Sequence, residues 1–352
     1  MPGPVYAYRT NRPGLSCEPD MFEQDTACYS KTIGRRKFCA VGSKFYHEVN
    51  EIMALTREQA KEVRTLQIKA AENRQTLIDL TYISGYSHLD GPLSATDILT
   101  ALYQKFLNFD KDHLDDPERD RFVLSKGHNA DIMYCIFANI GLYDRDELMR
   151  EYKAYMGRWG ERPNRFHNPG FEICSGSLGH GMPIAIGMAM AARIDKSKRR
   201  VYCLGGDGEL QEGLNWEAIM NAGHNKFGNL IMIVDQNRCQ GCRLVSETIN
   251  SDNLGERIAS FGWDVRELAD GNDMKQIYEV LNSLPVRSGE ERAKPICILL
   301  HTKKGCGVQY MEDGMAKWHA GGIGDDKIDE TRKSINDKLA AQLAVTDAII
   351  NG

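Results

Sequence analysis

Asp207 and Asn237 are the residues of this 352-residue chain whose types and spacing point most directly to chemistry. Each follows a short apolar run, Val201 to Leu204 for the aspartate and Leu230 to Val234 for the asparagine, and a helical pattern separates the two runs. Apolar runs joined by a helix are typical of strands buried on both faces of a parallel sheet. Because ligands bind at the carboxyl ends of such strands, both side chains should emerge at the same edge.

The residue types at this edge suit a metal diphosphate. Asp207 lies in the sequence Gly-Gly-Asp-Gly, and glycines allow backbone N–H groups to approach an anion closely. A carboxylate and an amide oxygen are hard ligands that favour Mg²⁺ or Ca²⁺. A metal with so few protein ligands completes its shell with phosphate oxygens. A plain turn after a strand would explain the glycines alone, but Asn237 at the next strand end makes the pair more specific.

The segment GDGELQEGLNWEA, followed by Asn237, resembles the thiamine diphosphate motif of the transketolases. The resemblance extends from about Leu55 to Asp329. It implies an α/β fold, a doubly wound, mainly parallel sheet flanked by helices, which is the diphosphate-binding domain of the thiamine diphosphate-binding fold. It also implies that Asp207, Asn237 and the backbone carbonyl of Cys239 ligate Mg²⁺, with Ca²⁺ or Mn²⁺ able to substitute.

Two further segments match the cofactor site of the family. RDRFVLSKGH ends in His128, which would contact the diphosphate from a strand end just before a helix, a suitable place for a phosphate. SGSLGHG, residues 175–181, is similar to the turn T-G-P-L-G-Q-G that lines the thiazolium, with His180 in place of the glutamine. The resemblance therefore implies cofactor contacts from His128, Gly176, Ser177, Leu178, Gly206, Asp207, Gly208, Glu209 and Asn237. It places Glu212 in a network that links two cofactor sites across an interface between subunits.

Two histidines resemble catalytic residues of the family. His88 lies in SGYSHLDGPLSATDIL, where Leu89 and Asp90 replace the usual Pro-Gly after the histidine. His319 lies in KKGCGVQYMEDGMAKWHAG, whose family counterpart faces the donor sugar and helps move protons during two-carbon transfer. Such general acid–base catalysis is worth roughly 10²–10⁴-fold in rate. The resemblance implies catalytic roles for His88, His319 and Glu212.

The Arg-rich segment 151–171 is expected to form a loop over the pocket. Arg162-Pro163 aligns with a family His-Pro that contacts the donor, and His167 is the rival for that position. Arginine would supply a bidentate anion contact in place of a titratable donor. We therefore expect an anionic sugar substrate, in contact with His88, Arg162, His167 and His319. Phosphorylated pentoses are the default, while a sulfonated or deoxy sugar or a carrier-bound aldehyde would fit as well.

Composition excludes several other classes of partner. The chain is 42% hydrophobic and 26% charged, and its formal net charge of −5 offers no basic excess for nucleic acid or an anionic membrane. Its apolar runs are too short to span a bilayer and no secretion signal is evident. The ten cysteines include several within apolar strand patterns, which favours a reducing, cytoplasmic location. Cys239 and Cys242 form one C-x-x-C without a second pair for zinc, and a redox role stays open.

The sequence divides into an irregular N-terminal extension, residues 1–53, and a thiamine diphosphate-binding domain with a C-terminal helix, residues 54–352. The extension shows neither helical nor strand periodicity. Met53 directly precedes the first helix signal, so an alternative start there is a hypothesis.

Three helix boundaries are specific enough to test. Thr56 followed by Gln59 is a capping-box pattern that predicts the start of a long helix. Ser94 followed by Asp97 predicts the start of a second helix by the same rule. The C-terminal helix is expected to run from about Asp326 to Leu343.

The resemblance implies a transketolase that transfers a glycolaldehyde unit from a ketose to an aldose or another aldehyde. Family enzymes also use a glutamate from a second, pyrimidine-binding domain, and no further strand–helix series follows here. We therefore expect a split enzyme, a heterotetramer in which the partner is a separate C-terminal subunit. Two alternatives are the α subunit of a 2-oxoacid decarboxylating enzyme and a non-catalytic cofactor-binding relative.

Overall fold

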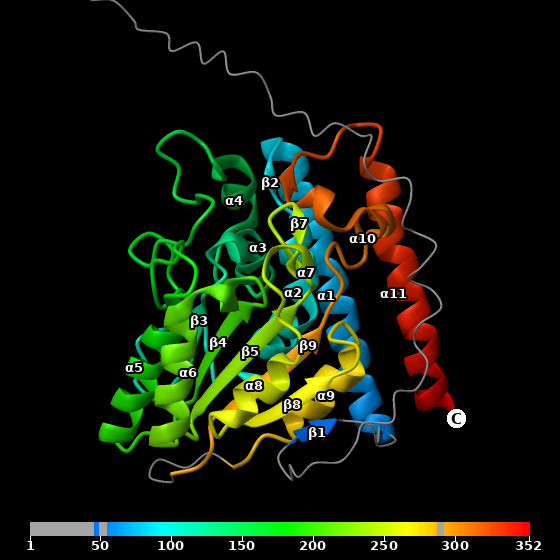
Figure 1. The fold of residues 1–352 in the computed structure, drawn as a ribbon. Coiled ribbons are helices and arrows are strands. Elements are labelled where there is room, and N and C mark those ends of the chain that lie inside the picture. Colours follow the sequence, from blue (N-terminus) through cyan, green and yellow to red (C-terminus); the bar gives the residue numbers. More distant parts are fainter. Residues whose placement is uncertain (1–45, 49–54, 287–291) are drawn as a thin grey trace, which may run out of the picture. The chain divides into compact units, whose positions relative to one another are not determined.

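The apolar runs predicted as strands lie side by side in one parallel sheet (Figure 1). The computed structural model describes residues 46–48, 55–286 and 292–352. Within them the sheet has six strands in the order β1-β8-β9-β5-β4-β3, and every pair in it is parallel. These strands are β1 (Tyr46–Glu48), β3 (Arg121–Leu124), β4 (Val201–Gly206), β5 (Leu230–Gln236), β8 (Asp264–Leu268) and β9 (Ile296–His301).

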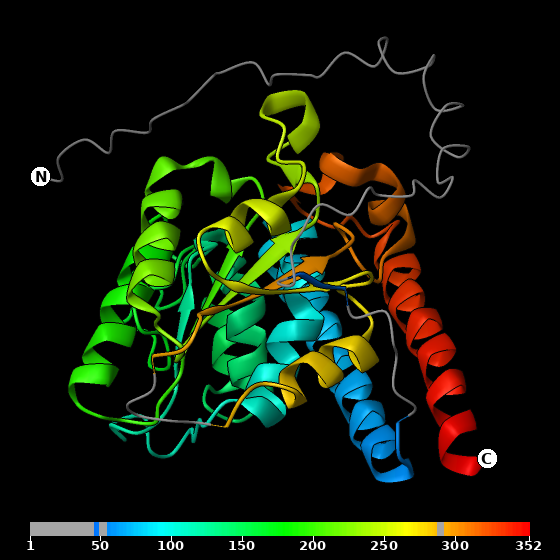
Figure 2. The same cartoon turned by 60° about the horizontal axis from the view of Figure 1, so that its bottom comes forward.

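Helices cover both faces of the sheet because successive strand residues point to opposite sides. In β4, Tyr202 and Leu204 join one buried core, and Val201 and Cys203 join the other. The first core is covered by α1 (Arg57–Ser84), α2 (Asp90–Ala101), α3 (Ala130–Asn139) and α9 (Met274–Asn282). The second is covered by α5 (Gly181–Ile194), α6 (Gly213–Asn225) and α8 (Leu254–Ser260) (Figure 2). The predicted doubly wound, mainly parallel sheet is confirmed.

Short elements complete the connections. They are β2 (Ser87–His88), a π-helical turn η1 (Leu102–Phe106), η2 (Gly127–Asn129), α4 (Arg145–Glu151), η3 (Glu209–Gln211), β6 (Cys239–Gln240), β7 (Arg243–Leu244), α7 (Val245–Thr248), α10 (Gln309–Gly314), η4 (Met315–Trp318) and β10 (Ala320–Gly321). The segment from residue 152 to residue 171 contains no helix or strand, as its composition predicted.

Helix α1 begins and ends as its sequence predicts. The Gln59 N–H donates to Thr56 Oγ1 at 3.2 Å, and the Thr56 N–H donates to Gln59 Oε1 at 2.9 Å, which completes the capping box. Gly85 ends the helix in the left-handed region, with φ of 72°.

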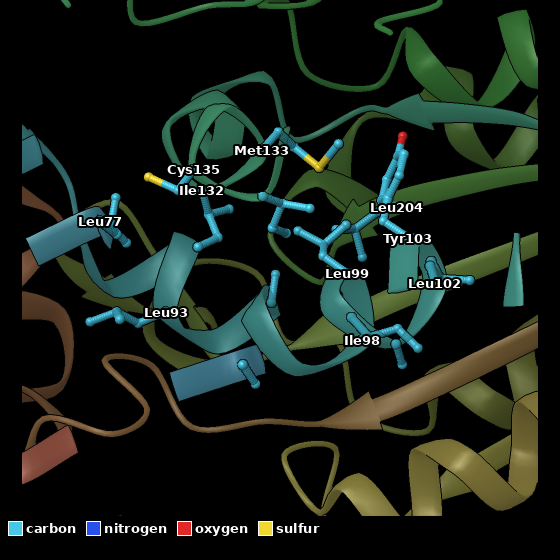
Figure 3. Packing of buried hydrophobic residues seen from close by; sticks show 14 of the residues in the cluster. Leu77, Leu93, Ile98, Leu99, Leu102, Tyr103, Ile132, Met133, Cys135 and Leu204 are labelled. Carbon is cyan, nitrogen blue, oxygen red and sulfur yellow. The ribbon is translucent and has the colours of Figure 1, made fainter. Parts of the chain in front are cut away.

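Helix α2 begins at Asp90, so the predicted start at Ser94 is wrong. Ser94 lies inside the helix, where its hydroxyl donates to the Gly91 carbonyl at 2.8 Å and to Asp235 Oδ2 at 2.6 Å. Asp97 pairs with Arg74 of α1. The capping pattern was misleading because both polar side chains serve tertiary contacts in a helix whose every residue is buried. Figure 3 shows Leu93, Ile98 and Leu99 in this packing.

The C-terminal helix α11 (Ile328–Asn351) is longer than predicted. It packs along α1, where Arg64 Nε donates to Asp347 Oδ1 at 2.7 Å and Thr346 Oγ1 donates to Gln67 Oε1 at 2.9 Å. Both contacts lie beyond Leu343, the predicted end. Tertiary packing therefore extends the helix past the point that local propensity indicated.

Strand β1 lies within the segment predicted to be irregular. Tyr46–Glu48 pairs with Val265–Glu267 of β8 at the edge of the sheet, so the prediction is wrong for these three residues. Three residues are too few for a periodicity signal to appear in the sequence. The rest of that segment, including Met53, lies outside the described residues.

The ion pair between Arg74 and Asp97 gives a test of this core. Arg74 Nη2 lies 2.6 Å from Asp97 Oδ2, and the two side chains are 4% and 1% exposed. Asp97→Ala would leave a buried guanidinium without its carboxylate, and we expect a loss of about 3–5 kcal/mol in the free energy of unfolding. Chemical denaturation measures it. Glu58→Ala, which breaks an exposed pair with Lys61, is the matched control and should cost less than about 1 kcal/mol. Equal losses for the two variants would contradict the assignment.

Candidate active site

The ends of β4 and β5 bring Asp207 and Asn237 to one edge of the sheet. Gly206 pairs with Asp235 in the register of the two strands, and the Asp207 N–H donates to the Asp235 carbonyl at 3.3 Å. Asp207 therefore follows β4 at the level where Asn237 follows β5. Both residues therefore lie at the same edge of the sheet, as the strand–helix–strand pattern predicted.

Asp207 is buried among backbone donors. Its two oxygens accept hydrogen bonds from Gly208 N–H at 2.9 Å and Arg238 N–H at 2.7 Å. Burial, followed by the Asp235 carboxylate, raises the pKa of Asp207 to about 6. Asn237 Oδ1 accepts from Cys239 N–H at 3.1 Å. A cation at this place would offset the cost of burying the carboxylate.

The donor set fits a hard divalent metal. Among the described residues, no group of three or more His, Cys, Asp or Glu side chains could hold a metal. The set expected from the sequence contains only one such side chain, Asp207, together with an amide oxygen and a backbone carbonyl. This composition is typical of Mg²⁺ bound partly through phosphate oxygens.

Glu209 forms hydrogen bonds to both Gly-rich turns, the one at Gly179 and the one at Gly206. Its Oε1 accepts from Gly179 N–H at 2.9 Å and from the Ser125 hydroxyl, and its Oε2 accepts from Gly206 N–H at 3.1 Å. Gly179 has φ of 84°, and a Cβ there would lie 2.8 Å from Glu212 Cβ, so a glycine is required on both grounds. Both oxygens of the expected cofactor-binding Glu209 thus serve the protein backbone and Ser125.

Asp235 is a buried carboxylate that reasoning from the sequence missed. Lys126 Nζ donates to its Oδ2 at 2.5 Å and Asn237 Nδ2 at 3.3 Å, and the Thr302 hydroxyl donates to Oδ1. The side chains of Asp235 and Lys126 are 0% and 4% exposed. An aspartate directly after the apolar run Leu230 to Val234 was the available signal, because a strand buried on both faces admits a charge only with a partner.

Three histidines from separate parts of the chain meet beside this edge. The ring centroids of His88 and His128 are 5.6 Å apart, those of His88 and His319 are 5.4 Å apart, and those of His128 and His319 are 5.6 Å apart. Burial lowers the pKa of His88 to about 4, with further lowering by Arg162 and His319. Burial, then Lys126, holds the pKa of His128 well below its usual range. Both imidazoles are therefore neutral near pH 7.

Backbone pairing holds His88 against His319. Strands β2 and β10 are antiparallel, with His88 opposite Ala320, and the Leu89 N–H donates to the His319 carbonyl at 3.4 Å. The His88 N–H donates to Asp131 Oδ2 at 3.0 Å, and the Tyr152 hydroxyl donates to Asp131 Oδ1 at 2.6 Å. Burial raises the pKa of Asp131 to about 7.

Asp90 and Lys304 complete the cluster and were not identified from the sequence as site residues. Lys304 Nζ lies 3.2 Å from Asp90 Oδ2, and His319 Nδ1 lies 3.5 Å from Asp90 Oδ1. Lys304 also donates to the Gly241 carbonyl at 2.9 Å. The available signal for Asp90 was its departure from the family's glycine.

Arg162 and His167, the two candidates in the loop of residues 152–171, lie in different surroundings. Arg162 lies near the histidines, where its charge lowers the pKa of His88, and a Cβ on Gly176 would lie 3.7 Å from its Cγ. The His167 side chain is exposed, and its carbonyl accepts from Arg158 Nε at 2.6 Å. Arg162 is therefore close enough to the histidines for its charge to affect them, whereas the contact described for His167 is made by its backbone carbonyl.

The remaining predicted site residues lie at the rim. Gly176, Ser177 and Leu178 are exposed in the turn before α5, and His180 Nδ1 lies 3.2 Å from the Leu178 carbonyl. Glu212 is exposed at the start of α6, next to Gly179. Cys239 is buried and Cys242 exposed, and both are free thiols.

Comparisons with known proteins match this arrangement. The family described as "Transketolase, thiamine diphosphate binding domain" matches residues 56–351. One of the subunits of apulose-4-phosphate transketolase from Phocaeicola vulgatus is 35% identical over 282 residues, which cover 79% of this chain and 96% of that protein. The 6-deoxy-6-sulfo-D-fructose transketolase subunit SqwG of a Clostridium species is 34% identical over 232 residues, 66% of this chain and 82% of that protein.

Solved structures give the same result for the fold. Transketolase of Campylobacter jejuni superposes with a TM-score of 0.67 and 27% identity over 81% of this chain. The match covers only 46% of that protein, so this chain spans about half the length of the solved transketolases it resembles. Among the described residues, every helix is too short or too polar to cross a bilayer.

The shifted histidine pKa values predict a particular pH dependence. His88 has a folded-state pKa of about 4, below the ordinary 6.5. As the pH falls, the unfolded chain therefore takes up this proton before the folded chain does. We expect this contribution to stability to be complete above pH 6.5 and to be lost as the pH falls toward 4. The free energy of unfolding, measured by denaturant at each pH, should fall less steeply over this window in His88→Asn than in the wild type. His113 is the matched control for the direction of the shift, because its hydrogen bond with Asp110 raises its pKa, whereas burial lowers that of His88. A His88 that titrates near 6.5 in NMR would contradict the assignment.

Proposed function

Because the chain belongs to the transketolase thiamine diphosphate-binding family, we propose that it is the diphosphate-binding subunit of a split transketolase. It would transfer a two-carbon ketol unit from a ketose to an aldose or another aldehyde. The observation that supports this most strongly is the cluster of His88, His128 and His319 beside the edge that carries Asp207 and Asn237.

The cofactor would be thiamine diphosphate with Mg²⁺. Asp207, Asn237 and the Cys239 carbonyl would hold the metal, and the turn at Gly206 and Gly208 together with His128 would hold the diphosphate. The exposed turn of residues 176–178 would lie against the thiazolium ring. When bound, the cofactor supplies a nucleophilic carbon and an electron sink for the cleaved carbon–carbon bond.

The protein side chains would supply orientation and proton transfer. His88 and His128 are neutral near pH 7, so each offers one ring nitrogen as a hydrogen-bond acceptor for a sugar hydroxyl. His319 is half-buried between them, where it would take and return a proton as the carbon–carbon bond breaks and forms. These roles need the pocket to be covered, which the chain does not achieve alone because Arg162 and the 176–178 turn are exposed.

The missing cover would come from a partner subunit that carries the pyrimidine-binding domain and its glutamate. Two relatives that match along most of their length are named as transketolase subunits, whereas the match to the transketolase from Campylobacter covers only 46% of that protein. Large apolar side chains are exposed on the helices beside Glu212, namely Ile184, Met190 and Ile194 on α5 and Leu214 and Met220 on α6. Such a surface suits an interface between subunits. Two pairs of subunits would form a heterotetramer, in the reducing cytoplasm.

An anionic ketose is the proposed donor. Arg162 stands near the histidines, and Lys153 lies close by, paired with Glu161 at 2.8 Å. The names of the two relatives include a phosphorylated and a sulfonated sugar, both anionic. The planar guanidinium group of arginine can donate two parallel hydrogen bonds to a phosphate, a sulfonate or a carboxylate. Family membership weighs against the 2-oxoacid decarboxylase alternative.

The test is two-carbon transfer by the purified chain with thiamine diphosphate, Mg²⁺ and a panel of phosphorylated, sulfonated and neutral ketoses. It is run with and without a separately expressed C-terminal transketolase subunit that carries the pyrimidine-binding domain. Turnover only with the partner would support the split enzyme and identify its donor. Cofactor binding without turnover under either condition would favour a non-catalytic relative.

Arg162→Ala tests the donor site. We expect KM for an anionic donor to rise about 10- to 100-fold, the loss of a charge-assisted contact worth roughly 1.5–3 kcal/mol, while cofactor affinity stays unchanged. Steady-state kinetics and a cofactor titration measure both. His167→Ala is the control and should leave KM unchanged. An unaltered KM in Arg162→Ala would remove this residue from the substrate site.

Asp207→Ala tests the metal site. We expect Mg²⁺-dependent binding of thiamine diphosphate to be lost, because the variant lacks the one carboxylate of the proposed donor set. Isothermal titration calorimetry with and without Mg²⁺ measures this. Asp252→Ala removes an exposed carboxylate elsewhere and should bind normally. Retained metal-dependent binding in Asp207→Ala would place the metal elsewhere.

A further inference from the structure

Asp90 stands beside His319 without a role in the family resemblance. It is the first residue of α2 and its side chain is 0% exposed. Its Oδ1 lies 3.5 Å from His319 Nδ1, and neither atom has a hydrogen bond within the described structure. A buried acceptor and a buried ring nitrogen, each without a hydrogen-bond partner, thus face each other. Such groups are rarely left unsatisfied in folded proteins.

We propose that Asp90 is a positioning residue that accepts a hydrogen bond from His319 Nδ1–H and thereby fixes the tautomer of His319. A carboxylate on one ring nitrogen places the proton there and leaves the lone pair on the other. His319 would then present Nε2 as a proton acceptor in the pocket. The same logic applies wherever a buried aspartate orients a catalytic histidine.

The surrounding contacts favour this assignment because they hold Asp90 in place. The Asp90 carbonyl accepts from Gly305 N–H at 3.0 Å, and the preceding Leu89 N–H donates to the His319 carbonyl at 3.4 Å. The segment that carries Asp90 is therefore bound to both the loop after β9 and the segment of His319.

Lys304 supplies the counter-charge that a buried carboxylate needs. Its Nζ lies 3.2 Å from Asp90 Oδ2, the oxygen not facing His319. The rings of His88 and His128 lie 5.4 and 5.6 Å from the His319 ring. Neither is an anion. Asp90 is thus the carboxylate that the described residues present to the His319 ring.

The effect of this contact on catalysis rests on the proposed function, whereas the tautomer of His319 can be measured whether or not that function is right. The first experiment is therefore NMR of the full chain, labelled with ¹⁵N at histidine, with His319→Gln to assign the signals. We expect wild-type His319 to carry its proton on Nδ1, whereas free neutral histidine prefers Nε2. In Asp90→Gly, which restores the family's residue, the Nε2-protonated form should become the major one.

Further variants keep the result interpretable. The double variant Asp90→Gly/Lys304→Met removes both charges together and is used if Asp90→Gly alone folds poorly. It should show the same change in the His319 tautomer. Lys304→Met alone keeps Asp90 and should retain the Nδ1 proton. Glu267→Gln is the matched control, because Glu267 contacts His301 Nε2 elsewhere on the sheet and should change only the His301 signals.

Kinetics of the chain together with its partner provide the second readout. Asp90→Gly should lower kcat about 10²-fold, within the range of general acid–base catalysis, with KM changed less than about threefold. A wild-type His319 protonated on Nε2, or His319 signals unmoved by Asp90→Gly, would overturn the proposal even if activity fell. A wild-type chain with the expected tautomer but no ketol transfer would refute the proposed function alone.

Discussion

The Asp235 carboxylate is the interaction on which the rest of the site depends. Its oxygens accept hydrogen bonds from Lys126, Ser94, Asn237 and Thr302, which come from four separate segments of the chain. Burying this charge is costly without such donors, and their number makes the arrangement specific. Lys126, Ser94 and Asn237 share Oδ2, whereas Thr302 alone among these donors bonds Oδ1, so its removal would leave that buried oxygen without one of them.

Each segment held by Asp235 also carries a residue of the candidate site. Lys126 is two residues before His128, Ser94 lies one turn after Asp90, and Thr302 is two residues before Lys304. Asn237 is itself part of the expected metal site. A single buried charge thus holds the segments that carry His128, Asp90 and Lys304 near the strand ends, and Glu209 links the two Gly-rich turns.

Two residues expected to depart from the family pattern, Arg162 and Asp90, lie near the histidines. By the resemblance, Arg162 is one of two candidates for a family histidine position and Asp90 stands where the family has glycine. The charge of Arg162 lowers the pKa of His88 and His128, and Asp90 contacts His319. The departures therefore alter the electrostatics around the reacting group while the expected metal and diphosphate residues stay intact. This pattern is expected when a fold keeps its cofactor chemistry and changes its substrate.

The sequence by itself determined the elements and the chemistry of the strand ends. Apolar runs predicted β4 and β5 to within two residues of their ends, since a strand buried on both faces needs such a run. The capping box of Thr56 and Gln59 fixed the start of α1, because that signal is local. The motif at Asp207 and Asn237 likewise indicated the edge of the sheet at which both side chains lie.

Only the tertiary structure decided which side chains meet. Ser94 and Asp97 resembled a helix start, yet they lie inside α2, and the long α11 continues past its predicted end because it packs on α1. The contacts of Asp90 with Lys304 and His319 join residues more than two hundred positions apart. Local patterns report propensity and period, whereas buried charges find their partners through the packing of distant segments, so no single stretch of sequence carries that information.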